Sequence, residues 1–231
     1  MYGETTDPSV TCVQTKIVIV GDCNCGKTTL INRYIKGEYL EKYTPTGFDT
    51  YTGTYKVSST YRIKMSIWDT SGDSGYDRVR PLSYTDADLV LVCFSIGDPD
   101  SVENVKTKWH PEIREYCPNQ PIMLIGCKSD LRTDTSTISK LEKTKQTVLS
   151  YDQGLSLAKQ IGALVYSETS AKSCPRSVTD VLEVAALSSA GTRHTPTFKR
   201  QRSFIRRKRF SGVQDAQLQL RKEAVKSCSV M

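Results

Sequence analysis

The chain has 231 residues, of which 38% are hydrophobic and 25% charged, so it can fold around a sizeable core and is not wholly disordered. None of its apolar runs approaches the roughly 20 residues that a membrane-spanning helix needs. Residues 192–231 contain 11 Lys or Arg and two acids, whereas the 21 basic and 23 acidic residues of 1–191 nearly balance. The basic end of the chain therefore indicates an acidic partner, either nucleic acid or anionic lipid.

Six segments rich in apolar and β-branched residues predict strands, and they alternate with patterns typical of helices. The predicted strands are 15–20, 50–57, 61–69, 89–95, 122–127 and 164–168, and the predicted helices are 27–36, 101–116, 150–161 and 177–188. Strands that alternate with long helices predict an α/β fold, here a six-stranded, mostly parallel sheet with flanking helices. We expect this domain to occupy residues 15–190, after a short extension (1–14) and before a flexible basic tail (191–231).

The eight cysteines show no paired C-x-x-C spacing, and only two histidines accompany them. We therefore expect free thiols rather than disulfide bonds or a zinc site. The first residues contain neither the charged nor the apolar segment of a secretory signal, so the sequence predicts a cytosolic protein unless another signal anchors it.

A phosphate-binding motif follows the first predicted strand. Residues 21–28 read GDCNCGKT and match G-x-x-x-x-G-K-[ST], between a strand and a helix as the motif requires. The glycines let backbone N–H groups surround phosphate oxygens at the amino end of a helix, where the helix dipole favours anions. Lys27 would reach the β- and γ-phosphates, and the Thr28 hydroxyl would bind Mg²⁺. Alone, the motif predicts a phosphate site of a kind that kinases and ATPases share.

Three further motifs follow later strands, at the edge of a parallel sheet where ligands bind. Residues 68–72 (WDTSG) place a carboxylate near the metal and a glycine amide near the γ-phosphate, residues 126–130 read GCKSD, and residues 168–172 read ETSAK. The carboxylate of Asp130 can accept hydrogen bonds from both N1–H and the 2-amino group of guanine, a pair of donors that adenine lacks. The ordered set therefore favours a guanine nucleotide.

In this order the motifs resemble those of the Ras superfamily of small GTPases, over about residues 15–190. The resemblance implies a P-loop NTPase fold that binds GTP and Mg²⁺, with Asp130 reading guanine, Lys128 along the base and the backbone of 170–171 contacting the base oxygen. It also implies that residues 43–46 (YTPT) belong to a first switch, in which Thr46 coordinates Mg²⁺ together with Thr28. The implied nucleotide-binding residues are Asn24, Cys25, Gly26, Lys27, Thr28, Thr29, Tyr39, Tyr43, Thr46, Asp69, Gly72, Cys127, Lys128, Asp130, Ser170, Ala171 and Lys172.

Two features resemble the Rho branch of that superfamily. Residues 76–84 (YDRVRPLSY) are similar to the second switch of Rho proteins, and the segment between Asp130 and Ser170 is long enough for an additional charged helix at about 136–147. The resemblance implies a monomer that binds effectors through two switch loops, the first at 39–51 and the second at 69–84.

The residues that hydrolyse GTP in cycling members are replaced here. After Asp-Thr-x-Gly such members have a glutamine that orients the attacking water, whereas this chain has Asp73, which lacks a donor and adds negative charge near the γ-phosphate. Cys23 stands where cycling members have a glycine, and it crowds both that glutamine and an incoming arginine finger. Since these two elements together account for roughly 10⁵-fold in stimulated hydrolysis, the sequence predicts that hydrolysis is very slow or absent. No catalytic residue is then intact, and the protein is held in its GTP state.

These replacements, residues 127–134 (CKSDLRTD) and the terminal CSVM are together most similar to the Rnd (RhoE-like) subfamily of Rho proteins. That resemblance implies effectors that control actin organisation and adhesion, including Rho-system GTPase-activating proteins and plexins. Two residues depart from it, because Gly47 replaces the valine that is usual after Pro-Thr and Asp73 is not the residue expected of Rnd members. The alternative is an ordinary cycling Rho GTPase.

The last four residues (228–231, CSVM) form a C-a-a-X box whose terminal Met favours farnesylation of Cys228. One lipid chain anchors weakly, and the basic cluster at 206–209 (RRKR) supplies a second signal at about 1 kcal/mol per basic residue near an anionic leaflet. We therefore expect the protein at the cytoplasmic face of the plasma membrane or endomembranes, and partly in the cytosol when Ser203 and Ser211 are phosphorylated. The basic cluster alone would equally suit nuclear import or nucleic-acid binding. The lipid signal favours the membrane, so no nucleic-acid partner is expected.

Overall fold

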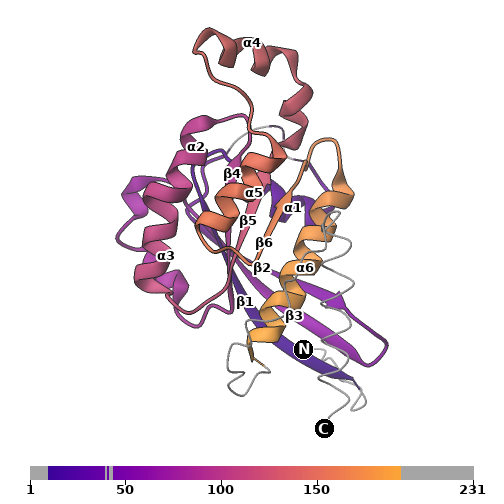
Figure 1. Ribbon diagram of the computed structural model, residues 1–231. Coiled ribbons are helices and arrows are strands. Elements are labelled where there is room, and N and C mark those ends of the chain that lie inside the picture. Colours follow the sequence, from indigo (N-terminus) through magenta and orange to yellow (C-terminus); the bar gives the residue numbers. More distant parts are fainter. Residues whose placement is uncertain (1–9, 40, 42–43, 194–231) are drawn as a thin grey trace.

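The computed structural model describes residues 10–39, 41 and 44–193, which form a central sheet with helices on both faces (Figure 1). The strands are β1 (Thr11–Gly21), β2 (Phe48–Lys56), β3 (Tyr61–Thr70), β4 (Leu89–Ser95), β5 (Ile122–Cys127) and β6 (Val165–Glu168). Their order across the sheet is β2-β3-β1-β4-β5-β6, in which β2 pairs antiparallel with β3 and every other pair is parallel. The predicted α/β fold with a six-stranded, mostly parallel sheet is confirmed.

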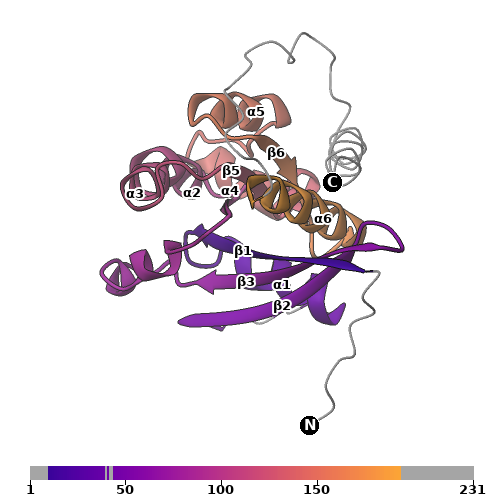
Figure 2. The same cartoon turned by 90° about the horizontal axis from the view of Figure 1, so that it is seen from below.

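The helices divide between the two faces of the sheet (Figure 2). They are α1 (Lys27–Lys36), α2 (Pro99–Asn104), α3 (His110–Tyr116), α4 (Thr135–Lys143), α5 (Tyr151–Gln160) and α6 (Pro175–Arg193). Apolar side chains of α1 and α6 form one buried cluster with β1 and β3, and those of α3 and α5 form a second cluster on the opposite face. Along the described part of the chain, no helix is both long and apolar enough to cross a bilayer.

Strands β4 and β5 are buried along their whole length, and they coincide with the predicted bounds. Strand β1 instead begins at Thr11, so part of the expected extension 1–14 belongs to the sheet. Side chains alternate between exposed and buried at 12–15, where the strand pairs with the start of β3 at Tyr61. The continuous apolar run that predicts the strand begins later, because only the carboxyl-terminal half of β1 has both faces covered.

The predicted helix 101–116 is interrupted in its middle by a π-helical segment, Val105–Trp109, between α2 and α3. Pro111, in the first turn of α3, has no N–H to donate to a carbonyl one turn earlier, so regular α-helical bonding cannot run through this point. The last predicted helix, 177–188, is longer than expected, since α6 continues to Arg193 and past the predicted domain end at residue 190.

The additional helix predicted at about 136–147 is α4, which stands away from the sheet at the upper end of Figure 1. It begins at Thr135, where the Asp134 side chain accepts the Thr137 N–H at 2.8 Å and caps the helix. It ends at Lys143, earlier than predicted, because residues 144–145 form a turn.

The seven cysteines of the described residues are free thiols.

Candidate nucleotide-binding site

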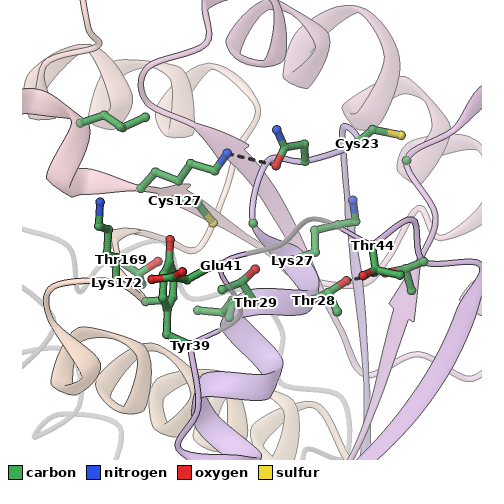
Figure 3. A pocket seen from close by; sticks show the side chains of 18 of the residues that line it. Cys23, Lys27, Thr28, Thr29, Tyr39, Glu41, Thr44, Cys127, Thr169 and Lys172 are labelled. Atoms are coloured by element: carbon green, nitrogen blue, oxygen red, sulfur yellow. Dashed lines mark hydrogen bonds between the residues drawn. The ribbon is translucent and has the colours of Figure 1, made fainter. Parts of the chain in front are cut away.

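A cleft of about 280 Å³ lies at the edge of the sheet where β1, β3, β5 and β6 end, and all four sequence motifs contribute to it (Figure 3). Of the predicted residues, the cleft is lined by Asn24, Gly26, Lys27, Thr28, Thr29, Tyr39, Thr46, Gly72, Cys127, Lys128, Asp130, Ala171 and Lys172. Cys25, Asp69 and Ser170 are buried next to these residues and do not line the cleft. Tyr43 and Cys228 lie outside the described residues.

The phosphate loop, residues 21–28, connects β1 to α1 and has a backbone that requires glycine at both ends. Gly21 and Gly26 have φ values of +143° and +119°, and a Cβ on Gly21 would lie 2.0 Å from the Cys93 carbonyl oxygen. The Lys27 ammonium group donates to the carbonyls of Gly21 at 2.9 Å and Asp22 at 2.8 Å. Lys27 therefore supports the loop from within while its charge faces the cleft.

Lys27 is buried, and its protonation follows from its neighbours. Burial acts to lower the pKa of Lys27, but nearby Cys25 and Asp69 act to raise it, and the pKa lies above the ordinary value. The side chain is thus a cation at neutral pH, suited to a phosphate oxygen.

The oxygens of Thr28, Thr46 and Asp69 converge at one end of the cleft. Thr28 Oγ1 lies 2.7 Å from Thr46 Oγ1 and donates to Asp69 Oδ2 at 2.6 Å. Asp69 Oδ1 is buried without a hydrogen-bond partner among the described residues, and burial raises the pKa of Asp69 to about 6, against the Thr28 hydrogen bond and the Lys27 charge. Two hydroxyls backed by an incompletely satisfied carboxylate fit a hard divalent cation such as Mg²⁺.

At the other end of the cleft, the Ser170 hydroxyl holds Asp130 in place, a role that the sequence motif did not indicate. Ser170 Oγ donates to Asp130 Oδ1 at 2.5 Å, which fixes the carboxylate. The Ser170 N–H donates to Ser177 Oγ at 3.1 Å, so of the predicted pair 170–171 it is Ala171 that faces the cleft. Lys128 lies along this wall in the left-handed region, with φ of +58°, and donates to Asn24 Oδ1 at 3.4 Å.

A partly buried ion pair joins the two loops of the base end. Arg132, in the turn that contains Asp130, donates to both oxygens of Glu168 at 2.7 and 2.9 Å. The Tyr166 hydroxyl donates to the same carboxylate at 2.7 Å. This contact spans 36 residues of sequence, and no local pattern indicates it. It positions the Asp130 turn against the end of β6.

Asp73 and Cys23, which replace the glutamine and glycine of cycling members, have different surroundings. Asp73 is exposed, and its Oδ1 accepts the Gly75 N–H at 2.7 Å, which caps the short helical turn Ser74–Tyr76. Cys23 lines the cleft where the phosphate loop meets the second switch (Figure 3). The two loops touch so closely there that a Cβ on Gly72 would lie 2.4 Å from the Cys23 backbone nitrogen.

Several lining residues lie within or next to the motifs but were not among the predicted nucleotide-binding residues. They are Leu30, Glu41, Thr44, Thr70, Ser71, Leu131 and Thr169. Thr44, Thr70, Ser71 and Thr169 are other positions of the motifs themselves, and the remaining three lie within a few positions of a predicted residue. Glu41 and Thr44 belong to the first switch and line the cleft together with Tyr39 and Thr46 of the same segment.

Comparison with known proteins gives a consistent result. Residues 16–188 match the family model described as the Ras family. Rho-related GTP-binding protein RhoE of Homo sapiens is 46% identical to this chain over 225 residues, which cover 95% of this chain and 91% of that protein, and RhoE of Mus musculus gives the same values. GTP-binding protein rho5 of Schizosaccharomyces pombe is 46% identical over 174 residues, which cover 75% of this chain and 86% of that protein.

Proposed function

Because this chain belongs to the Ras family and is a RhoE-like GTP-binding protein of the Rho branch, we propose that it signals from a persistent GTP state and hydrolyses GTP very slowly or not at all. The observation that carries this proposal is the position of Asp73. Its carboxylate has no donor, and it already accepts the Gly75 N–H at 2.7 Å. An acceptor engaged in its own turn is a poor replacement for the glutamine amide that orients water in cycling members.

Nucleotide binding itself follows from the geometry of the cleft. Lys27 and the backbone of the phosphate loop would hold the phosphates, and the Asp130 carboxylate would accept the two guanine donors. Thr28 and Thr46 would hold Mg²⁺, which when bound neutralises charge on the β- and γ-phosphates. Asp69 Oδ2 accepts a hydrogen bond from the Thr28 hydroxyl at 2.6 Å, which would leave the lone pairs of the hydroxyl oxygen for the metal.

Cys23 supports the same proposal from the opposite side of the cleft. Its exposed side chain lines the cleft, and the backbone that carries it lies directly against Gly72 of the second switch. An arginine supplied by an activating protein would have to enter this region to stabilise the transition state. Loss of both the arginine and the water-orienting amide accounts for the roughly 10⁵-fold that separates stimulated from intrinsic hydrolysis.

The nucleotide that accompanies the protein tests the proposal directly. We expect full-length protein purified from cells at neutral pH with Mg²⁺ to release GTP when denatured, because bound GTP is not cleaved. Ion-exchange chromatography of the released nucleotide would distinguish GTP from GDP. A cycling Rho GTPase purified in parallel provides the control and should release GDP. Recovery of mainly GDP from this protein would favour the alternative of an ordinary cycling enzyme.

Effectors would dock on apolar side chains that the two switches expose together. Phe48 lies within the first switch, and the ring of Tyr76 from the second switch lies edge-on to it with centroids 5.7 Å apart. Leu82 is 74% exposed, which is unusual for a leucine and typical of a protein contact. By resemblance to RhoE-like proteins, we propose that the partners include Rho-system GTPase-activating proteins and plexins, and that the outcome is altered actin organisation and adhesion.

We also propose that the tail anchors the protein to membranes. The C-a-a-X box at 228–231 would be prenylated on Cys228, and the basic residues of the tail would bind an anionic leaflet. Replacing Cys228 with Ser is expected to move the protein fully from the membrane fraction to the cytosol, because the basic segment alone binds reversibly. Fractionation and immunoblotting of expressing cells would measure this shift. Retention of the variant on membranes would exclude the lipid anchor.

Charge on the tail should regulate the same attachment. Ser203 and Ser211 lie among arginines and lysines, and each phosphate adds about −1.5 to −2 charges. Two phosphates would cancel nearly half of the tail's charge, so the double variant Ser203→Asp, Ser211→Asp should be partly cytosolic. The double Ala variant is the matched control. Equal membrane fractions for both variants would exclude electrostatic release and leave the lipid anchor unaffected.

A further inference from the structure

Trp109 lies between the phosphate loop and the second switch, and it contacts both. Its side chain is fully buried at the end of the π-helical segment. The indole N–H donates to Asp22 Oδ1 of the phosphate loop at 2.7 Å. The Arg80 guanidinium, from the second switch, lies over the ring with its central carbon 4.6 Å from the centroid. One side chain thus bridges two segments that would surround the γ-phosphate.

On the side of the phosphate loop, Asp22 is held at its side chain and at its backbone. Its second carboxylate oxygen accepts the Asn104 amide at 2.7 Å, so both oxygens are bonded to the helical segments behind the loop. Its carbonyl accepts the Lys27 ammonium group at 2.8 Å. The Asp22 carboxylate therefore points away from the nucleotide and fixes the loop from behind.

On the side of the second switch, Arg80 is fully buried, and each of its three guanidinium nitrogens donates a hydrogen bond. It binds both oxygens of Glu112 in α3 at 2.8 and 2.6 Å, and it also contacts Asp77. Its remaining nitrogen donates to the Ser71 carbonyl at 3.0 Å. Ser71 directly precedes Gly72, whose amide is expected near the γ-phosphate, so Arg80 positions this peptide.

We propose that Trp109 is a positioning residue for nucleotide binding, which couples the phosphate loop to the second switch so that the arrangement of one fixes that of the other. The π-helical segment supports this role, because such segments are rare and recur at functional sites. The coupling would act on GTP binding, which the family establishes, and does not depend on the loss of hydrolysis. A Trp109 that only filled the core would affect stability without linking the two loops.

The variant Trp109→Phe tests the coupling, because it keeps an aromatic ring near Arg80 and removes the indole N–H together with part of the bicyclic ring. A hydrogen bond to a charged acceptor is lost, so GTP should dissociate about tenfold faster. Amides of residues 69–84 should also exchange faster with deuterium in the GTP-bound protein. Asn104→Ala is the matched control, since it removes the other bond to Asp22 without touching Arg80. It should accelerate GTP dissociation and leave exchange at 69–84 unchanged.

Two outcomes would overturn the proposal. One is a GTP dissociation rate that Trp109→Phe leaves unchanged, and the other is equal exchange at 69–84 in the Trp109 and Asn104 variants. If Trp109→Phe does not fold, the variant Trp68→Phe provides the test instead. The chain has two tryptophans, so this change leaves Trp109 as the only indole whose fluorescence is observed. The emission of Trp109 should then shift when a chelator and phosphatase remove Mg²⁺ and GTP. Unchanged emission would mean that Trp109 does not sense the loop.

Discussion

Replacing Asp130 with Asn is expected to weaken GTP binding by about 10²- to 10⁴-fold, because two hydrogen bonds to a charged acceptor are lost or reversed. The carboxylate accepts from both N1–H and the 2-amino group, whereas an asparagine amide would direct its own N–H₂ at one of these donors. Xanthine carries a carbonyl in place of the 2-amino group and can accept from that amide. Preference should therefore shift from guanine to xanthine nucleotides.

Competition of GTP and xanthosine triphosphate against a fluorescent guanine nucleotide would measure both affinities. Ser170→Ala is the matched control, since Ser170 Oγ donates to Asp130 Oδ1 at 2.5 Å without being part of the base recognition itself. It should weaken GTP binding about tenfold or less and keep the preference for guanine. Unchanged GTP affinity in Asp130→Asn would mean that the base is bound elsewhere.

Hydrolysis is expected to return in part when Cys23→Gly and Asp73→Gln are combined. The first change opens the space beside Gly72, and the second supplies an amide that can orient water. In the presence of a Rho-type activating protein, single-turnover GTP cleavage should rise by several orders of magnitude, toward the roughly 10⁵-fold that such proteins provide. Release of labelled phosphate from protein preloaded with GTP would measure the rate.

The single variants and Asp73→Asn separate the contributions. Asparagine retains a side-chain oxygen that can accept the Gly75 N–H, which Asp73 accepts at 2.7 Å, but it is too short to reach the position of the glutamine amide. Asp73→Asn should thus preserve the turn and remain inactive. A double variant no faster than the parent would place the cause of slow hydrolysis in another residue, and a parent that already cycles quickly would refute the persistent GTP state.

The sequence predicted those parts of the fold that depend on local pattern. β4 and β5 are continuous apolar runs because central parallel strands are covered on both faces, so their bounds were predicted correctly. The amino-terminal part of β1 was missed for two reasons. Side chains at 12–15 alternate between exposed and buried instead of forming an apolar run, and their pairing with β3 is not visible in the local sequence. The phosphate loop was found because its backbone geometry demands glycine at fixed spacing.

The contacts that hold the site in place could not be predicted in the same way. Arg132 meets Glu168 across 36 residues, and Trp109 meets Asp22 across 87. Such pairs are created by the packing of distant elements, and each partner alone is an ordinary charged or aromatic residue. The π-helical segment was equally hidden, since Pro111 indicates an interruption but not the form that it takes.

Gly47 has a consequence for the contact between the two switches. A Cβ at residue 47 would lie 3.4 Å from the Tyr76 hydroxyl, an ordinary contact distance, and the ring of this tyrosine rests against Phe48. Gly47 therefore leaves the Tyr76 ring without a neighbour at this point, whereas a side chain at 47 would touch the ring and add to the contact between the two switches.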